Sequence, residues 1–230
     1  MPRIRAVFFD HGHTLAEPHG GSWWPGHRFD EVTRAHGLEI ARDARFAAAL
    51  ARGYAFLDAN HAVADIEEED EHFAEYYRVV LRELQLPAPP ALIAQLSHAY
   101  VRELNFAPYD DTRATLDRLR GMGLALAVIT DSWPSVEAKY GRLGLREYFA
   151  AFVISSRERC IKPDPRMFTP ALRATGCTPG EVLFVDDGAD LVESAREQGF
   201  HGLVMDRAGA HPRQPDFVRR LEEVIDHVER

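Results

Sequence analysis

Residues 3–17 read RIRAVFFDHGHTLAE. Within this stretch, Ile4–Phe9 is a short run of apolar, β-branched and aromatic residues apart from Arg5, which is typical of a strand buried on both faces of a sheet. The run ends at Asp10, and polar, turn-forming residues follow it. A buried strand with a carboxylate at its carboxyl end is a common layout of α/β active sites, so Asp10 is the first candidate catalytic residue. The alternative is that Asp10 only ends the strand and caps a turn.

Further strand patterns occur in the second half of the chain, and helical patterns separate them. This alternation predicts right-handed crossovers and a parallel sheet, which is an α/β fold. The predicted strands are Leu124–Ile129, Phe152–Ile154, Val182–Val185 and Leu203–Met205. A closing amphipathic helix is predicted from Phe217, Leu221, Val224 and Val228.

The region from about residue 28 to residue 104 has only helical periodicity. One helical face, for example, carries Phe73, Tyr77, Val80 and Leu84. The acidic run Glu67–Glu71 stands at the start of this helix, where it favours the helix dipole and is expected to be a solvated surface. We therefore expect a helical insert between the first strand and the rest of the sheet.

Composition limits the functional classes. The chain has 230 residues, 46% of them hydrophobic and 27% charged, which is ordinary for a globular protein with a sizeable core. Its net charge of -9 argues against a general nucleic-acid binder. Cys160 and Cys177 make no disulfide framework or zinc site. No apolar run could span a bilayer and no signal-peptide pattern is present, so a cytoplasmic protein without membrane partners is expected.

Three predicted strand ends carry polar groups. They are Asp10, Thr130 with Asp131, and Asp186 with Asp187. Because the carboxyl ends of neighbouring parallel strands meet in one crevice, these carboxylates would repel unless a proton or a cation lies between them. A hard cation such as Mg²⁺ suits such oxygen ligands. Lys162, one of only two lysines in the chain, could face the same crevice and hold Asp10 ionised, although an isolated lysine is more often a solvated surface residue.

Four motifs now resemble those of the haloacid dehalogenase-like (HAD) hydrolase superfamily. They are DHGHTL at 10–15, ITD at 129–131, KPDP at 162–165 and VDDGAD at 185–190, and their order and spacing fit the family along the whole chain. The resemblance implies a Rossmann-like core formed by residues 1–17 and 106–230. It also implies that residues 18–105 are an α-helical cap inserted between the first and second motifs.

The resemblance also implies roles for individual residues. Asp10 would be the nucleophile that forms an aspartyl-phosphate, Thr130 would hydrogen-bond the transferring group, and Lys162 would stabilise the developing charge. Asp131 would join Thr130 and Lys162 as a substrate-binding residue of the core. Mg²⁺ would be held by Asp10, the backbone carbonyl of Gly12 and Asp187, with Asp186 or Asp190 as the additional acidic group; the register between those two stays open.

The first motif departs from the family pattern Asp-x-Asp-Gly-Thr. Gly12 stands where the second Asp normally protonates the leaving group and activates water, and His13 replaces the usual glycine. His11 or His13 could supply that function, or both could be loop residues without a role in proton transfer. The cap carries no lysine, which argues against phosphonatase chemistry, and the missing Asp argues against a mutase.

These observations predict a hydrolase, with a Mg²⁺-dependent phosphatase acting on a small phosphorylated metabolite as the first choice. The alternatives are a metal-independent 2-haloacid dehalogenase, which the acidic pair Asp186–Asp187 disfavours, and a catalytically silent relative that binds a phosphorylated ligand or a protein. At the entry to the predicted cap, Arg28 could bind an anionic substrate group, or the Trp-rich stretch around it could be only a hinge. A monomer or homodimer is expected.

Overall fold

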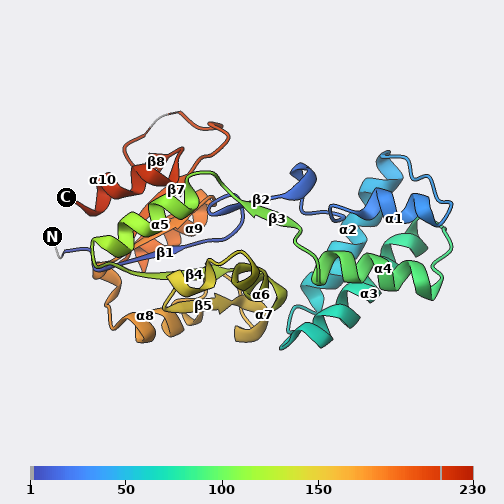
Figure 1. Ribbon diagram of the computed structural model, residues 1–230, viewed down its shortest axis with the longest axis horizontal. Helices are drawn as coiled ribbons and strands as arrows, with labels where there is room; N and C mark the ends of the chain where they lie inside the picture. Colours follow the sequence, from blue (N-terminus) through green and yellow to red (C-terminus); the bar gives the residue numbers. More distant parts are fainter. Residues whose placement is uncertain (1–2, 213, 230) are drawn as a thin grey trace. The chain divides into compact units, whose positions relative to one another are not determined.

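A six-stranded sheet forms the centre of the structure, a computed structural model that describes residues 3–212 and 214–229 (Figure 1). The strand order is β5-β4-β1-β6-β7-β8, and the neighbouring strands pair in parallel. The predicted α/β fold with a parallel sheet is therefore confirmed. The strands are β1 (Ala6–Phe9), β4 (Ala125–Thr130), β5 (Ala151–Ile154), β6 (Val182–Asp186), β7 (His201–Met205) and β8 (Phe217–Val218).

The register of the three central strands brings their carboxyl ends to one level. Phe9 pairs with Val128 of β4 and with Val185 of β6, and all four residues of β1 are buried. The backbone N–H of Asp10 then donates to the carbonyl of Val185 at 2.9 Å, which continues the pairing one residue beyond β1. Polar residues that follow these strands are consequently placed side by side, as the alternation of strands and helices predicts.

Helices lie on both sides of the sheet (Figure 1). Phe8, Phe184 and Val153 point to one face, where they form a buried cluster with Ala171 of α8 and Ala195 of α9. Helix α5 contacts β4 and packs against α10. The helices of this unit are α5 (Thr112–Gly121), α6 (Ser135–Arg142), α7 (Ser155–Glu158), α8 (Thr169–Thr175), α9 (Ala189–Glu197) and α10 (Val224–Val228).

The chain forms two compact units. The first contains the residues up to Glu17, Pro108–Ser132 and the residues from Tyr140 onward, and the second contains Pro18–Ala107 and Trp133–Lys139. Two short strands, β2 (Ala16–Pro18) and β3 (Phe106–Pro108), pair with each other where the chain passes between the units. The boundary between Lys139 and Tyr140 divides helix α6, so its first residues belong to the second unit and its last residues to the first.

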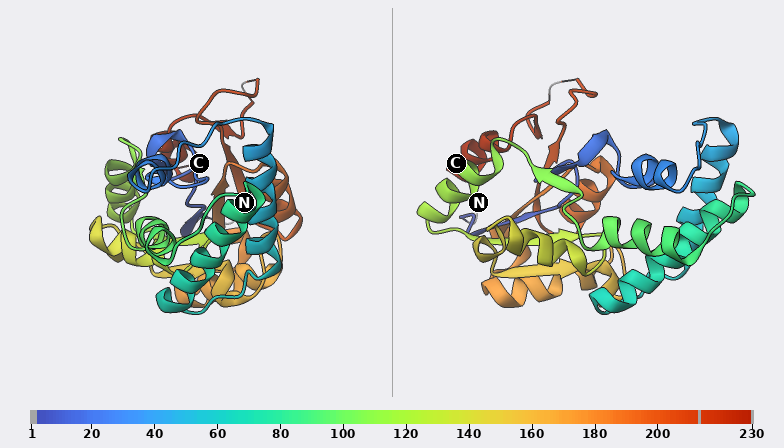
Figure 2. Two further views of the ribbon diagram at one scale, coloured as in Figure 1. Left: turned by 90° about the vertical axis from the view of Figure 1, so that its right-hand side faces the viewer. Right: turned by 45° about the vertical axis from the view of Figure 1, so that its right-hand side comes forward.

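The second unit is mainly helical, and Figure 2 shows its helices from two further sides. The side chains of Asp43 and Asp65 accept backbone N–H groups at the starts of α2 and α3, so both helices begin at side-chain caps. Its core is aromatic: Trp24 stacks on Phe73 and on Tyr100. The helices are α1 (Phe29–Ala35), α2 (Ala44–Ala59), α3 (Ile66–Glu83) and α4 (Pro90–Val101).

Two sequence-based expectations need correction. Glu69, in the acidic run that was expected to be solvated, is only 1% exposed and binds Ser135. The closing segment is not one amphipathic helix, because Phe217 lies in β8 and only Val224–Val228 form α10. Among the described residues, no helix is both long and apolar enough to cross a membrane.

Candidate active site

Asp10 and Lys162 form a buried ion pair at the carboxyl end of β1. The Lys162 Nζ lies 2.6 Å from Asp10 Oδ1 and also 2.6 Å from Asp186 Oδ2. All three side chains are almost completely buried, with at most 8% of each exposed. One ammonium group therefore bridges the carboxylates that follow or end two neighbouring strands, β1 and β6.

Burial controls the protonation of this pair. It raises the pKa of Asp10 to about 8; Lys162 opposes the shift, and the charges of Asp186 and Asp187 add to it. Burial alone would lower the pKa of Lys162, but the charges of Asp10 and Asp186 outweigh it and hold that pKa above its usual range. The lysine consequently stays a cation, and it is the group that favours ionised Asp10.

The end of β4 orients Lys162. Asp131, directly after β4, accepts the backbone N–H of Lys162 on Oδ1 at 3.0 Å. Thr130, the last residue of β4, is 2% exposed and pairs with Ile154 of β5. The structure thus brings Asp10, Thr130, Asp131 and Lys162 to the same end of the sheet.

Asp186 and Asp187 differ in their surroundings. Asp186 is buried, and its second oxygen accepts the backbone N–H of Gly188 at 2.8 Å. Asp187 is exposed, and it lies close enough to Asp10 and His13 for their charges to interact. Asp186 therefore binds Lys162 and its own loop, whereas Asp187 is exposed as a residue, although burial raises the pKa of its carboxyl group.

The loop after Asp10 has an unusual backbone. His13 adopts a φ of 52°, in the left-handed region where a residue other than glycine carries a conformational cost of about 1 kcal/mol. Gly12, the residue before it, forms an isolated bridge with Ala16. Glycine adopts this conformation without strain, which explains why the pattern Asp-x-Asp-Gly-Thr has glycine where this chain has His13. The histidine adopts the same conformation at a conformational cost.

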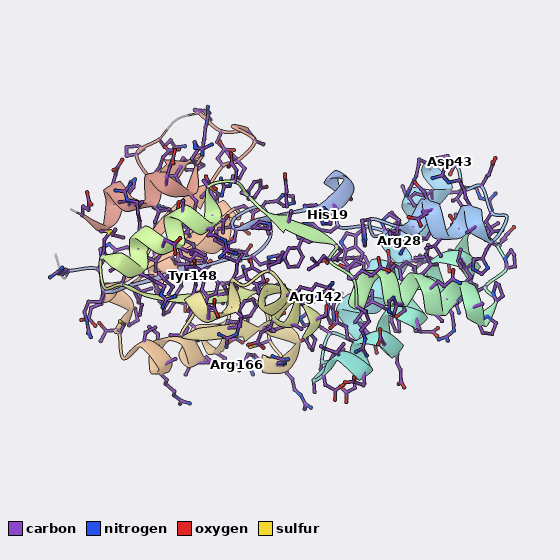
Figure 3. The ribbon with its side chains drawn as sticks, viewed as in Figure 1. His19, Arg28, Asp43, Arg142, Tyr148 and Arg166 are labelled. Atoms are coloured by element: carbon purple, nitrogen blue, oxygen red, sulfur yellow. The ribbon has the colours of Figure 1, made fainter. Side chains whose placement is uncertain are left out.

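Arg28 belongs to the second unit, where it stands at the start of α1 (Figure 3). Its guanidinium donates to both oxygens of Glu103, at 2.8 and 3.1 Å, and forms a second ion pair with Glu31. Two carboxylates of its own unit therefore engage this side chain. Its role in substrate binding stays a prediction.

The acidic groups of the first unit suit a hard cation. Three carboxyl groups, Asp10, Asp186 and Asp187, lie near a single cation, Lys162. In the part of the chain that the structure describes, no group of three His, Cys, Asp or Glu side chains is arranged to hold a metal ion. Mg²⁺ typically keeps several waters and takes only one or two protein carboxylates together with substrate phosphate, so a site without three such side chains is compatible with this ion. The donor set of Asp10, Asp187 and the Gly12 carbonyl stays a prediction.

The chain matches the model of the haloacid dehalogenase-like hydrolases over residues 4–199. It belongs to this family. The resemblance that the four motifs indicate is therefore confirmed, and the chain is a HAD hydrolase.

Known phosphatases are similar to this HAD hydrolase. Glyceraldehyde 3-phosphate phosphatase of Methanopyrus kandleri is 28% identical over 238 residues, which cover 98% of this chain and 97% of that protein. Phosphoserine phosphatase of Thermus thermophilus is 35% identical over 130 residues, which cover 55% of this chain and 52% of that protein. These relatives favour a phosphatase over a dehalogenase, although haloacid dehalogenases are also among the relatives.

The fold is shared with a solved dehalogenase. The structure of L-2-haloacid dehalogenase from Xanthobacter autotrophicus superposes with a TM-score of 0.68 at 23% identity, and the match covers 98% of each chain. At this identity the likeness concerns the fold alone.

One contact of the site has no counterpart in the sequence-based prediction. The His11 Nδ1 lies 3.0 Å from the hydroxyl of Tyr140 in α6. Tyr140 is predictable from the sequence only as an apolar position of a helix, because periodicity reports burial and not the partner of a hydroxyl group. The only sequence signal is a histidine directly after Asp10, the predicted nucleophile.

Proposed function

We propose that this HAD hydrolase is a Mg²⁺-dependent phosphatase that acts on a small phosphorylated metabolite in the cytoplasm. The observation that carries the proposal is the Lys162 ammonium between Asp10 and Asp186, with Asp187 nearby. A buried nucleophile beside a fixed cation and an acidic cation site is suited to an anionic phosphoryl group. The similarity to two phosphatases supports the same reading.

In this proposal Asp10 supplies the nucleophile. One of its oxygens attacks phosphorus, the ester P–O bond breaks with its electrons moving to the leaving oxygen, and an aspartyl-phosphate results. Water then attacks that phosphorus, which releases inorganic phosphate and regenerates the carboxylate. Lys162 neutralises charge on Asp10 and on the phosphoryl oxygens, while the Thr130 hydroxyl donates to the transferring group.

Mg²⁺ would be held by Asp10, the Gly12 carbonyl and Asp187, with Asp186 nearby, and when bound it supplies the positive charge that lets a carboxylate approach a phosphate. Asp131 holds the backbone of Lys162 and thereby the position of its ammonium. Arg28 remains the candidate for binding an anionic group from the second unit.

Position 12 limits the proposed reaction, because glycine has no proton to give to the leaving oxygen. Esters with acidic leaving groups should therefore react best. We expect faster turnover of p-nitrophenyl phosphate than of phenyl phosphate, since nitrophenolate leaves without protonation. Gly12→Asp, which restores a carboxylate at this position, should reduce the ratio of turnover on p-nitrophenyl phosphate to turnover on phenyl phosphate.

The deciding experiment is hydrolysis of p-nitrophenyl phosphate with Mg²⁺ and with EDTA. We expect activity only with Mg²⁺, loss of activity in Asp10→Asn, and wild-type activity in Asp43→Asn. The last is a matched control, because Asp43 caps α2 in the second unit (Figure 3) and asparagine caps equally well. Turnover by Asp10→Asn at the wild-type rate would refute the proposal.

A metal-independent 2-haloacid dehalogenase is the second candidate, and Gly12 favours it because displacement of a halide needs no protonated leaving group. In that reaction Asp10 would attack carbon and release halide, after which water would hydrolyse the ester. Halide release from 2-chloropropionate in the presence of EDTA would identify it. A protein without either activity would be a catalytically silent relative that binds a phosphorylated ligand or a protein.

A further inference from the structure

His11 organises the loop that follows the nucleophile. It is 5% exposed, and its carbonyl oxygen accepts the backbone N–H groups of both Leu15 and Ala16 at 3.0 Å. The position of His11 therefore determines how the loop closes behind Asp10. Whatever holds the His11 side chain also holds the residue that precedes it in the chain.

Tyr140 holds that side chain. Its hydroxyl lies 3.0 Å from His11 Nδ1, and the two rings meet edge to face with centroids 5.5 Å apart. Tyr140 itself is 1% exposed and is packed against Phe152 and Phe149, at centroid distances of 5.0 and 6.0 Å. The hydroxyl is therefore carried by a ring that cannot move without disturbing the aromatic residues around it.

The two anchors of the nucleophile approach from opposite faces of the sheet. The Lys162 Nζ lies 5.9 Å from the ring centre of Phe184, and Phe184 shares a buried cluster with Val153. Phe152 precedes Val153 in β5, so its side chain points to the other face, which is the face of Tyr140. Asp10 is thus held through Lys162 from one face and through its neighbour His11 from the other.

We propose that His11 and Tyr140 form a positioning pair that fixes Asp10 opposite Lys162. The pair touches neither substrate nor metal in this proposal, and it acts by restricting the loop. It rests on the proposed function only in taking Asp10 as the nucleophile, which the phosphatase and the dehalogenase reactions share. A displacement of about 1 Å at a nucleophile can reduce turnover by about a hundredfold, so one buried hydrogen bond is sufficient for the effect.

The test is a double-mutant cycle with Tyr140→Phe and His11→Leu. Each single change should lower kcat by about tenfold or more and leave KM nearly unchanged, because misalignment affects the attack more than binding. The double variant should be no slower than the worse single variant, since both remove the same hydrogen bond. His11→Asn, whose amide can take the place of Nδ1, should keep most of the activity.

Tyr148→Phe is the matched control. It also removes a tyrosine hydroxyl of the first unit, where Figure 3 labels Tyr148. That hydroxyl donates to Asp117 at 2.6 Å, and its removal should leave kcat unchanged. Wild-type kcat in Tyr140→Phe would overturn the positioning pair. So would a double variant whose loss of kcat is the product of the losses in the two single variants. Should Tyr140→Phe not fold, the two His11 variants decide, because equal kcat in His11→Asn and His11→Leu contradicts a role for the hydrogen bond.

Turnover is measured in parallel on p-nitrophenyl phosphate with Mg²⁺ and as halide release from 2-chloropropionate. Activity on the haloacid alone would refute the proposed phosphatase and still allow the cycle to be completed on Asp10. The absence of both activities would overturn both proposals, because no nucleophile would then need positioning.

Discussion

Replacing Glu69 by Gln should change how the stability of the second unit depends on pH. Glu69 lies on α3, and its two oxygens accept the backbone N–H and the hydroxyl of Ser135, each at 2.6 Å. Burial raises the pKa of Glu69 to about 7; Ser135 and Lys139 oppose that shift. The folded protein therefore holds a proton on Glu69 at pH values where the unfolded chain has lost it.

The sign and size of the effect follow from this difference. A glutamate in the unfolded chain titrates near pH 4.5, so the contribution of Glu69 to stability is fully present below that pH. It is lost as the pH rises towards 7, because the unfolded chain then binds fewer protons than the folded protein. With about 1.4 kcal/mol for each pH unit, the loss amounts to about 3 kcal/mol.

Glutamine at position 69 can keep both hydrogen bonds to Ser135, but its amide group does not titrate. Its amide oxygen can accept the Ser135 N–H, and its amide nitrogen can donate to the Ser135 oxygen once that hydroxyl proton turns away. The free energy of unfolding of Glu69→Gln minus that of the wild type should thus rise by about 3 kcal/mol between pH 4.5 and 8. Other titrating groups contribute to both proteins and cancel in the difference.

Urea unfolding followed by tryptophan fluorescence measures this quantity. Trp23, Trp24 and Trp133 all lie in the second unit, so the signal reports on the unit that holds Glu69. Glu71→Gln, at an exposed position on the same helix, is the control and should change the free energy of unfolding by no more than about 0.5 kcal/mol. A constant difference for Glu69→Gln would refute the protonation of this buried carboxylate.

Three further predictions concern other buried positions. Lys162→Met should reduce turnover by about a hundredfold or more in the phosphatase assay, and it should lower the free energy of unfolding by about 3–5 kcal/mol in urea, because Asp10 and Asp186 would lose their shared cation. Gly53→Ala should destabilise the second unit by about 1–3 kcal/mol in the same assay, although alanine favours helices, because the added methyl group would lie 2.6 Å from Tyr76. Burial lowers the pKa of His72 to about 4, so the unfolded chain binds more protons than the folded protein as the pH falls from 6.5. His72→Phe should therefore reduce the decline in the free energy of unfolding between pH 6.5 and 4. A decline equal to that of the wild type would contradict this.

The sequence predicts the parts of the fold that depend on local pattern. Leu124–Ile129 is a continuous apolar run, Ile4–Phe9 is apolar except for Arg5, and each contains most of a strand of the central sheet. Strand β8 has only two residues, Phe217 and Val218, which is too short for any periodicity to be visible. An apolar spacing that continued into α10 therefore suggested a single helix.

Some contacts of the candidate site could be predicted from the sequence, and others could not. That Asp10 and Asp186 lie near each other could be predicted, because the carboxyl ends of neighbouring parallel strands share one crevice. Lys162 follows α7 and not a strand, so the sequence indicated only that it could face this crevice. The burial of Glu69 and the bond between His11 and Tyr140 could not, since both depend on partners 66 and 129 residues away in the chain. An acidic run indicates a solvated surface until a particular tertiary contact encloses one of its members.

The burial of both lysines has a practical consequence. Lys139 and Lys162 are 3% and 5% exposed, and the chain has no other lysine side chain. Acylating reagents and amine-directed cross-linkers therefore meet no accessible ε-amino group on the folded protein. The two lysines lie in different units, so peptide mapping of lysine acylation during partial unfolding would show which unit opens first.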